Sequence, residues 1–537
     1  MAALRRFMAI MLADLRERTR STRFWVVLAL VGVATWWCFP ALQTGKVAVG
    51  VDGTRGYYSS AWAGLSLGLM YSTLLAWLGF YLVRGTLVRD FDTRVWQLLV
   101  TTPMTRRGYL LAKWTSHMAV FTLVMVLGLV VGFVAQWVHA EDRTLDVVEL
   151  LKPMLVLSMP ALTLTAFFAV LFDMVPRLRR TGGNVLFFFV WLLLFSITGI
   201  NMDPSHSEWA RQTWLSDPSG MTLIQRNLQV QLAQIAPALD ASSMSVGVST
   251  MDDGAKLFAW TRWEVALRDI AGRLLWVLAA VIGILLLAPA LDRAAARTSR
   301  QQVGANHAGR RLAWLDRLLN PLQRSALGLL LSAELRLVLR QRRWWWWLAI
   351  ASAWAVQLFA PTKIAGIAAV VAWMISLDIL ARGILREREA RTAALLFTAP
   401  QSINRLLLAR TATALGITGS AVLPMLLRLI ASAPATAAIL LLVAANVALA
   451  GLAMGALCRS ARPYELMMAM LAYAGIQGLG PLAVPAVEGT LLVGHLVALP
   501  LLAAILLLLW PPLNSSDWPR LPALRSMSRA GRLPGSA

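Results

Sequence analysis

Charged residues, and acidic residues above all, are scarce in this sequence. Only 14% of its 537 residues are Asp, Glu, Lys or Arg, and only 27 residues are acidic. A water-soluble protein of this length could not cover its surface with so few charges. The composition therefore excludes an ordinary soluble protein and favours a chain that lies largely in lipid.

Cysteine and histidine are also nearly absent. The two cysteines, Cys38 and Cys458, fall at the outer end of one apolar block and the inner end of another, so they could not form a disulfide within the chain. The five histidines are scattered and form no cluster with cysteine. We therefore expect no metal site.

Motifs of soluble enzymes are missing as well. The chain has no G-x-x-x-x-G-K-[ST] stretch, and so no phosphate-binding loop of its own with which to hydrolyse ATP. It also lacks an H-E-x-x-H zinc motif. Asp203, His206 and Glu208 are close in sequence, but they fit the ordinary polarity of a loop better than a catalytic group. We expect no catalytic residue and no directly bound cofactor.

What the sequence does contain is long apolar runs. Hydrophobic residues make up 58% of the chain, and the mean hydropathy is +0.64. Most of the runs are long enough to cross a hydrocarbon core about 30 Å thick. We predict an all-α, polytopic membrane protein of about twelve transmembrane helices, over residues 24–39, 61–83, 114–138, 153–173, 185–200, 270–290, 344–360, 364–381, 411–430, 436–457, 464–480 and 490–510.

The net charge of +23 reports membrane topology. If the N-terminus is cytoplasmic and the blocks alternate in direction, most Lys and Arg fall on the cytoplasmic side, as the positive-inside rule expects. We therefore expect a multi-pass protein with both termini in the cytoplasm and no nucleic-acid partner. A cleaved signal peptide with residues 24–39 as its core is the alternative for the N-terminus, but the same arrangement recurs in mid-chain, where no signal peptide can sit.

An internal repeat divides the chain. The second and fourth of the four matches flank a charged segment of about 30 residues between two blocks, and the third match lies inside that segment. The last two matches share one offset of 297 residues (98 against 395, and 109 against 406). An even number of spans in each half makes the halves parallel. The matches are Leu12–Arg16 with Ser332–Arg336, Arg84–Arg89 with Arg382–Arg386, Leu98–Pro103 with Leu395–Pro400, and Tyr109–Lys113 with Leu406–Arg410.

We predict two six-helix halves on this basis, residues 1–292 and 326–512, joined by a basic cytoplasmic linker (293–325) and followed by a cytoplasmic tail (513–537). An amphipathic stretch that could lie in the membrane interface precedes the first span of each half. Only the first half has a long outer loop, residues 201–269. It carries a helical stripe that would form either a helix packed on the mouth of the bundle or a substrate-handling cap: Ile224, Leu228, Leu232, Ile235 and Leu239.

The repeated charged segments resemble the loop between the second and third spans of permease subunits of ABC transporters of the export type 2 class. The family pattern is an acidic residue, a Thr, Leu-Leu, a Pro and then a basic residue before the next span. The usual Gly before the Thr is absent; Asp92 and Arg391 stand there. The matching residues are Asp90, Asp92, Thr93, Leu98, Leu99, Pro103 and Lys113, and Glu387, Glu389, Thr392, Leu395, Leu396, Pro400 and Arg410.

The resemblance implies a fused pair of permease halves in a bacterial inner membrane. Such a permease exports a substrate, using ATP that is hydrolysed by separate cytosolic ATP-binding cassette subunits, two copies of which would bind here. The leucine pairs would be the apolar anchors of docked coupling helices, with charged residues around them. The predicted contacts are Asp90, Arg94, Leu98, Leu99, Pro103, Arg106, Arg107, Glu387, Arg391, Leu395, Leu396, Pro400 and Arg405. Without a partner, the same segments would be plain positive-inside connectors.

Two other functions remain open. A secondary transporter of the major facilitator kind also has two parallel six-helix halves. It needs a short loop after the second span, generally with a G-x-x-x-D-R motif, and buried acids for ion coupling, and neither is evident in the sequence. Asp378 is one candidate acid, although Arg382 follows one helical turn later and favours a local ion pair. A membrane-bound enzyme without a recognisable site is the other alternative.

The topology gives the first testable prediction. Reporter fusions at Gly254 should report the periplasm, whereas fusions at Gly304 and after Arg532 should report the cytoplasm, because basic segments stay inside. Alkaline phosphatase and fluorescent-protein fusions would measure this. If Gly254 and Gly304 report the same side, the assignment of the spans is wrong.

Overall fold

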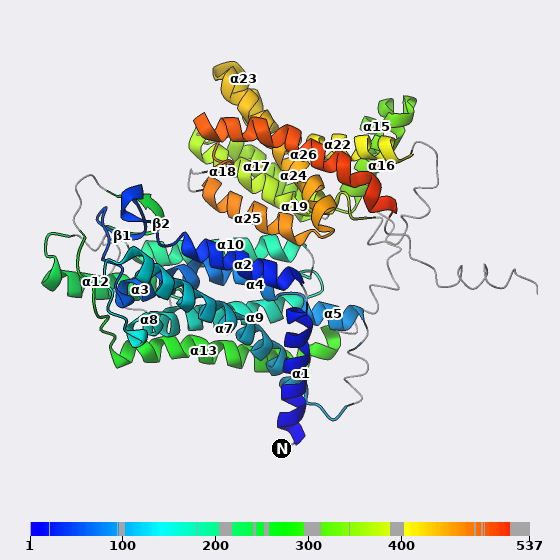
Figure 1. Cartoon of the computed structure of the whole chain (residues 1–537). Helices are drawn as coiled ribbons and strands as arrows, with labels where there is room; N and C mark the ends of the chain where they lie inside the picture. Colours follow the sequence, from blue (N-terminus) through cyan, green and yellow to red (C-terminus); the bar gives the residue numbers. More distant parts are fainter. Residues whose placement is uncertain are drawn as a thin grey trace, which may run out of the picture. The chain divides into compact units, whose positions relative to one another are not determined.

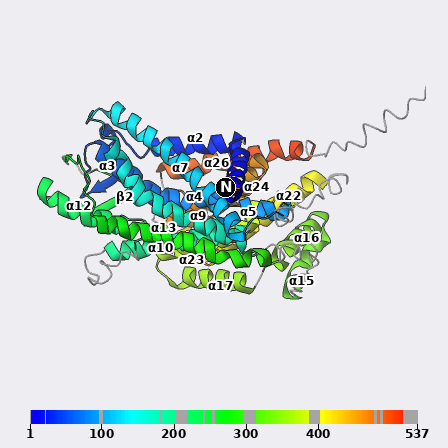
Figure 2. The same cartoon turned by 90° about the horizontal axis from the view of Figure 1, so that it is seen from below.

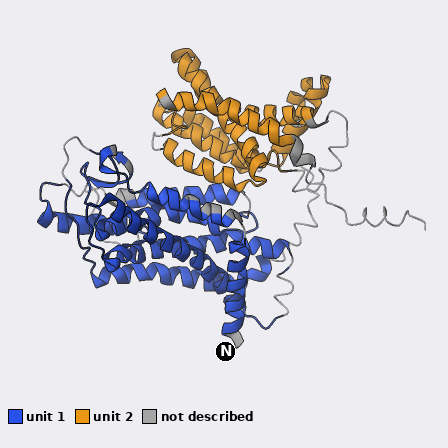
Figure 3. Cartoon of the chain, viewed as in Figure 1, with its two compact units in different colours: residues 1–305 blue, residues 306–537 orange. Residues whose placement is uncertain are grey.

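The computed structural model describes most of the chain, namely residues 2–20, 22–93, 95, 102–179, 181–202, 217–239, 243–251, 257–294, 313–342, 344–386, 402–476, 480–484, 487 and 489–515. The chain forms two compact units, Met1–Ala305 and Asn306–Ala537 (Figure 3). The boundary between them falls within the basic segment that we predicted as a linker.

Unit 1 is a bundle of long helices that run roughly side by side, while α1 (Ala2–Thr19) runs across their ends (Figure 1) and is seen along its axis in Figure 2. The other helical elements are α2 (Thr22–Trp36), η1 (Leu42–Thr44), α3 (Ser60–Met70), η2 (Tyr71–Leu75), α4 (Ala76–Val83), α5 (Thr86–Asp92), α7 (Arg106–His139), α8 (Val147–Pro153), η3 (Met154–Ser158), α9 (Met159–Met174), α10 (Thr181–Met202), α12 (Met221–Ile235), α13 (Leu267–Leu287) and η6 (Ala288–Ala290).

Unit 2 is also helical. Among its elements, α24 and α26 pack along each other, and α17 packs on α18. The elements are α15 (Ala313–Leu319), η7 (Pro321–Arg324), α16 (Ala326–Arg340), α17 (Trp344–Phe359), α18 (Thr362–Ile375), α19 (Leu377–Arg382), α22 (Ser402–Ala421), α23 (Leu423–Ser432), α24 (Pro434–Cys458), α25 (Arg462–Ile476) and α26 (Gly489–Ser515).

Seven described helical segments are long and apolar enough to cross a membrane: Ser60–Asp92, Arg106–His139, Val147–Met174, Leu267–Ala294, Thr362–Arg382, Pro434–Cys458 and Leu491–Trp510. An eighth arises if α22 and α23, which meet at a bend of 68°, form one span. The remaining predicted blocks lie on α2, α10, α17 and α25, which are helical but have shorter apolar stretches. The all-α, polytopic architecture is thus observed, whereas the count of about twelve spans stays a prediction.

Two helices of unit 1 depart from regular geometry at neighbouring points. The turns η2 and η3 are π-helical and contact each other. Pro160 follows η3 and has no N–H to donate to the carbonyl of Val156 four residues earlier. The guanidinium of Arg273 on α13 donates to that carbonyl at 3.1 Å. A side chain from another helix therefore binds the carbonyl to which Pro160 cannot donate.

A small antiparallel sheet lies at the end of unit 1 opposite α1, which we call the sheet end (Figure 1). Strands β1 (Lys46–Val51) and β2 (Met244–Thr250) pair with Val49 opposite Val246. The sequence did not predict this sheet, because β2 comes from the long loop and its partner strand is almost 200 residues away.

The predicted helical stripe of the long loop is correct in its first part. Helix α12 buries Ile224, Leu228 and Leu232. Ile235, however, is the last residue of the helix and is 47% exposed, and Leu239 lies beyond the helix. The stripe was wrong at these two positions, since Pro237 cannot continue a helix. The carboxylate of Asp217 begins the helix by accepting the N–H groups of Gly220 and Leu223.

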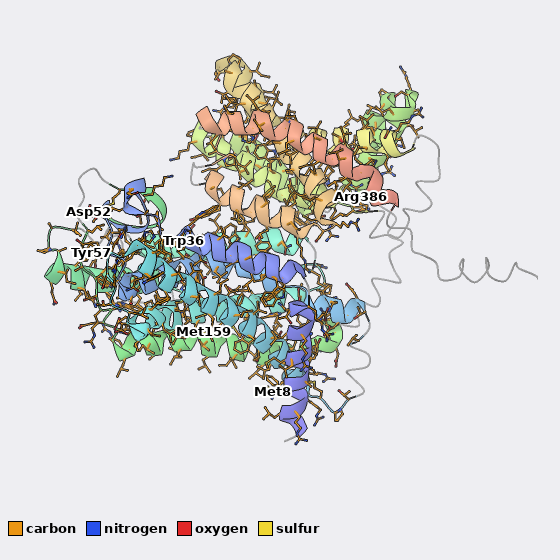
Figure 4. The ribbon with its side chains drawn as sticks, in the orientation of Figure 1. Met8, Trp36, Asp52, Tyr57, Met159 and Arg386 are labelled. Carbon is orange, nitrogen blue, oxygen red and sulfur yellow. The ribbon has the colours of Figure 1, made fainter. Side chains whose placement is uncertain are left out.

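A buried ion pair stabilises the sheet end. The buried guanidinium of Arg55 binds both carboxylate oxygens of Glu141, at 2.6 and 2.8 Å. The N–H of Tyr58 donates to Glu141 as well, and Trp36, labelled in Figure 4, stacks on His139 beside it. Burial by itself would raise the pKa of Glu141, but the hydrogen bonds and charge of Arg55 outweigh burial and lower it.

We therefore expect Glu141→Gln to destabilise the protein in a pH-dependent way. Because the pKa of Glu141 is lower in the folded state, its carboxylate stabilises the fold above the unfolded-state pKa of about 4.3, and this contribution is lost as the pH falls through the folded-state pKa. The melting temperature in detergent should fall at pH 7 and approach that of the wild type in acid. Glu264→Gln, an exposed position at the same end, is the control. An equal loss at every pH would contradict this account.

Candidate functional site

Charged side chains from three elements meet at the α1 end of unit 1. Asp14 on α1 is only 3% exposed. Its carboxylate lies 3.1 Å from the Lys113 ammonium, 3.3 Å from the Arg89 guanidinium and 3.4 Å from Nε of Arg18. Ser116 donates its hydroxyl to the same carboxylate. We call Asp14, Arg18, Arg89, Asp90 and Lys113 the first ion network.

Asp90 joins the end of α5 to the same network. Nζ of Lys113 lies 2.8 Å from Oδ2 of Asp90, and Tyr109 donates its hydroxyl to that oxygen at 2.7 Å. Lys113 on α7 therefore bridges two carboxylates, one from α1 and one from α5. Both ends of the charged segment between α5 and α7 are thus bound to α1.

The surroundings keep Asp14 ionised. Burial alone would raise the pKa of its carboxyl, but the ammonium of Lys113, the guanidinium of Arg18 and the hydrogen bond from Ser116 outweigh burial and hold the pKa well below its usual range. A buried carboxylate of this kind is stable only with its partners, because removing one charge leaves the others unpaired in a low dielectric.

Unit 2 contains a corresponding arrangement. Glu334 on α16 accepts a hydrogen bond from Arg386 at 2.7 Å and lies 3.5 Å from Nε of Arg410 on α22. The Arg410 guanidinium also packs over the Trp510 ring. We call Glu334, Arg386 and Arg410 the second ion network; Arg386 is labelled in Figure 4.

The two networks use matched positions of the sequence repeat. Asp14 and Glu334 occupy the same place in Leu12–Arg16 and Ser332–Arg336, and Arg386 and Arg410 follow Arg89 and Lys113 by the common offset of 297 residues. In each unit an acid on the helix that precedes the first block binds one base on each side of the charged segment. The amphipathic helix and both ends of that segment therefore form one electrostatic unit.

Five of the thirteen predicted cassette contacts are described. We expected Asp90 on an exposed rim, but it is 7% exposed, because Lys113 and Tyr109 bind it within the first ion network. Pro103 is exposed, and its carbonyl accepts a bond from Arg6. Arg106, Arg107 and Arg405 are exposed, and Arg106 pairs with Asp292. The other eight lie outside the described residues: Arg94, Leu98, Leu99, Glu387, Arg391, Leu395, Leu396 and Pro400.

The predicted pairing of Asp378 is confirmed. Its carboxylate lies 3.2 Å from Arg382, one turn later on α19, and 3.0 Å from Arg342. Arg84, which corresponds to Arg382 in the repeat, instead pairs with Asp173 of α9 at 3.4 Å. The paired arginine is therefore common to both units, but its acid comes from a different helix.

Sequence reasoning did not assign a role to Asp14 or Glu334. Both lay in a quoted repeat, and an acid at a matched place in two basic, amphipathic segments was the signal that could have found them. The bases that bind them come from distant positions, so the pairing itself needed the tertiary structure.

Neither a metal site nor a match to a known protein adds to this picture. In the parts of the chain that the structure describes, no three His, Cys, Asp or Glu side chains are grouped so as to hold a metal ion. Comparison with protein-family models, curated proteins and solved structures finds no match.

Asp14→Asn should destabilise the protein strongly. The substitution removes the anion that Lys113, Arg18 and Arg89 share. Lys113 and Arg89 keep their contacts with Asp90, but one carboxylate then faces the positive charge that two carboxylates had balanced, which costs on the order of 3 kcal/mol. Because the folded-state pKa of Asp14 is depressed, the difference in melting temperature from the wild type should stay constant from pH 8 down to about pH 4 and shrink only in stronger acid.

The matched control is Glu17→Gln on the same helix. Glu17 also pairs with Arg89, but its side chain is 55% exposed, and exposed pairs contribute at most about 1 kcal/mol. Equal melting temperatures for the two variants would show that the first ion network does not stabilise unit 1.

Proposed function

We propose that this chain is the permease of an ATP-driven exporter of the ABC type 2 class, moving a substrate with the help of cytosolic ATP-binding cassette subunits. The observation that carries the proposal is the pair of matched ion networks, one on each unit. Each network binds the two ends of a segment that also carries the family's Leu-Leu and Pro pattern in sequence.

The networks give these segments a physical means of coupling. A force on the segment between α5 and α7 would act on Asp90 and Lys113, and through Asp14 on α1 as well. Because breaking a buried ion pair costs several kcal/mol, the three elements would move together rather than separately. The second ion network would couple α16, Arg386 and α22 in the same way.

The exposed face of α1 supports a position at the membrane surface. Leu4, Met8 and Leu12 are 40 to 66% exposed and recur every fourth residue, so they form one apolar stripe. A stripe of this kind would be stable against lipid. In this proposal the networks and the termini face the cytoplasm of a bacterial cell, the chain crosses the inner membrane about twelve times, and the two units are parallel halves.

Three buried acids of unit 1 are held in ion pairs, which does not favour a role for them in an ion-coupled secondary transporter. Such a transporter uses buried carboxylates that can gain and lose a proton. The buried carboxylates of Asp90, Glu149 and Asp173 each lie within ion-pair distance of a lysine or arginine. These pairs suit structural roles, and a cassette-driven permease needs no titrating acid of its own.

The test of the coupling segments uses two double variants, Leu98→Ala with Leu99→Ala, and Leu395→Ala with Leu396→Ala. Losing two apolar anchors should cost on the order of 2 to 4 kcal/mol at one docking contact, which is about thirtyfold or more in affinity. Membrane level, co-purification of a co-expressed ATP-binding cassette subunit, and transport should be measured separately. We expect loss of co-purification or transport at normal membrane levels.

The control is Leu145→Ala with Val148→Ala, an exposed apolar pair at the sheet end. It should leave assembly and transport unchanged. Normal assembly and transport in both test variants would reduce the segments to positive-inside connectors and remove the basis of the proposal.

A further inference from the structure

A small pocket lies inside unit 1, and none of its lining residues belongs to the first ion network. Its volume is about 40 Å³, and α9 and α10 line it together with η2 and the loop that leads to α12. The hydroxyl-bearing residues Ser72, Thr73, Thr165, Thr198 and Ser219 all contribute to its wall, and all are buried. Phe168, Leu194 and Phe195 complete one side of the pocket and are partly exposed.

The irregular backbone at η2 makes this region polar, but two carbonyls in and next to η2 are already bound by side chains. The indole N–H of Trp191 donates to the carbonyl of Thr73 at 3.1 Å, and the hydroxyl of Thr165 donates to the carbonyl of Ala76 at 2.9 Å. The π-helical turn therefore leaves a polar wall rather than unpaired backbone groups.

The hydroxyl groups of the wall have their protons in use. Thr73 donates to the carbonyl of Leu69 at 2.6 Å, and Thr198 donates to that of Leu194 at 3.0 Å. Ser72 also donates to the Leu69 carbonyl, at 3.1 Å. What remains on each oxygen is lone-pair density, so the wall offers hydrogen-bond acceptors.

A charged ligand does not fit the pocket. The guanidinium of Arg273 lies beside Pro218 and Asp217, but all its contacts go to carbonyls: those of Val156, Leu157, Asp217 and Pro218. An anion would therefore find few free donors there. The carboxylate of Asp217 is occupied by Ser219, Gly220 and Leu223.

The Trp191 ring is already stacked and is poorly placed to bind a cation. Trp191 stacks on Trp77 with ring centroids 4.7 Å apart, and it stacks on Phe195 at 5.4 Å. Cation–π binding needs an unoccupied face of the ring. With no free carboxylate among its lining residues, the pocket has nothing that would compensate for the desolvation of a cation.

We propose that this pocket binds the hydrogen-bond donor of an uncharged amphiphile, such as the hydroxyl of a neutral lipid. The pocket has room for about three water molecules, enough for a small donor group. The apolar remainder of the ligand lies over Phe168, Leu194 and Phe195. The amphiphile is either cargo or a lipid that stays bound, and its chemistry at the pocket is the same in both cases.

The experiment uses a photoactivatable diacylglycerol with a diazirine near the head of one acyl chain, and the wild-type protein in lipid nanodiscs. After irradiation, mass spectrometry should find label on the α10 peptide that contains Trp191 and Phe195. Phosphatidic acid with the same labelled chain is the matched charged probe, and it should label that peptide at least several-fold less. Equal labelling by the two probes would overturn the proposal.

The variant Ser72→Ala with Thr198→Val removes two acceptors whose protons bond only within their own helices. Losing up to two hydrogen bonds should lower diacylglycerol labelling about tenfold. Leu194→Trp, which fills the mouth of the pocket, should lower it as well. Thr115→Val on α7, whose hydroxyl bonds its own helix in the same way, is the control. Unchanged labelling in both pocket variants, with normal melting temperatures, would refute the site.

Adding cassette subunits and ATP distinguishes the two sources of the ligand. Cargo would leave the pocket during turnover and labelling would fall, whereas a resident lipid would keep it constant; either result is compatible with the binding site. The labelling experiment itself needs no cassette subunit. Failure of the proposed export function would therefore leave this test intact, and the two proposals can fail separately.

Discussion

A buried carboxylate needs positive groups or hydrogen-bond donors around it, and this constraint organises the α1 end of unit 1 and its counterpart in unit 2. Asp14 and Glu334 are carried by short helices that precede the first apolar block of each unit, yet their partners lie on elements about 75 and 100 residues later in unit 1, and about 50 and 75 residues later in unit 2. Without these partners the acids would be expelled to solvent. Their position therefore fixes where the amphipathic helices sit on the long helices.

The sheet end is held together by several kinds of contact. There, Arg55 binds Glu141, the β1 strand pairs with β2, and Asp217 begins helix α12. These contacts join the first half's long loop to its bundle, and Arg273 extends the connection to the carbonyls of Val156 and Leu157 in η3. The loop is thus part of the folded unit. Its residues Pro218 and Ser219 complete the pocket that we assign to an uncharged amphiphile.

The proposed export function depends on charged side chains, whereas the proposed ligand site depends on uncharged hydrogen-bond acceptors. The ion networks rely on charges that hold several elements together, which suits the transmission of motion. The pocket has no free charge and presents only acceptors, which suits a weak and reversible contact with a neutral group. The aromatic rings around Trp191 are packed against one another and so shape the wall without binding a charge.

The sequence by itself determined the membrane-protein class, the positions of the apolar helices, the pairing of Asp378 with Arg382 and the first part of the α12 stripe. Each of these depends on residues within a few helical turns, so periodicity and composition are sufficient to predict it. Matched positions in the repeat also singled out the right segments. Only the tertiary structure decided that Asp90 is buried, that β1 pairs with β2, and that Asp14 joins Arg89 to Lys113. These features depend on partners tens to hundreds of residues apart, and the balance between burial and charge that stabilises them exists only once the chain has folded.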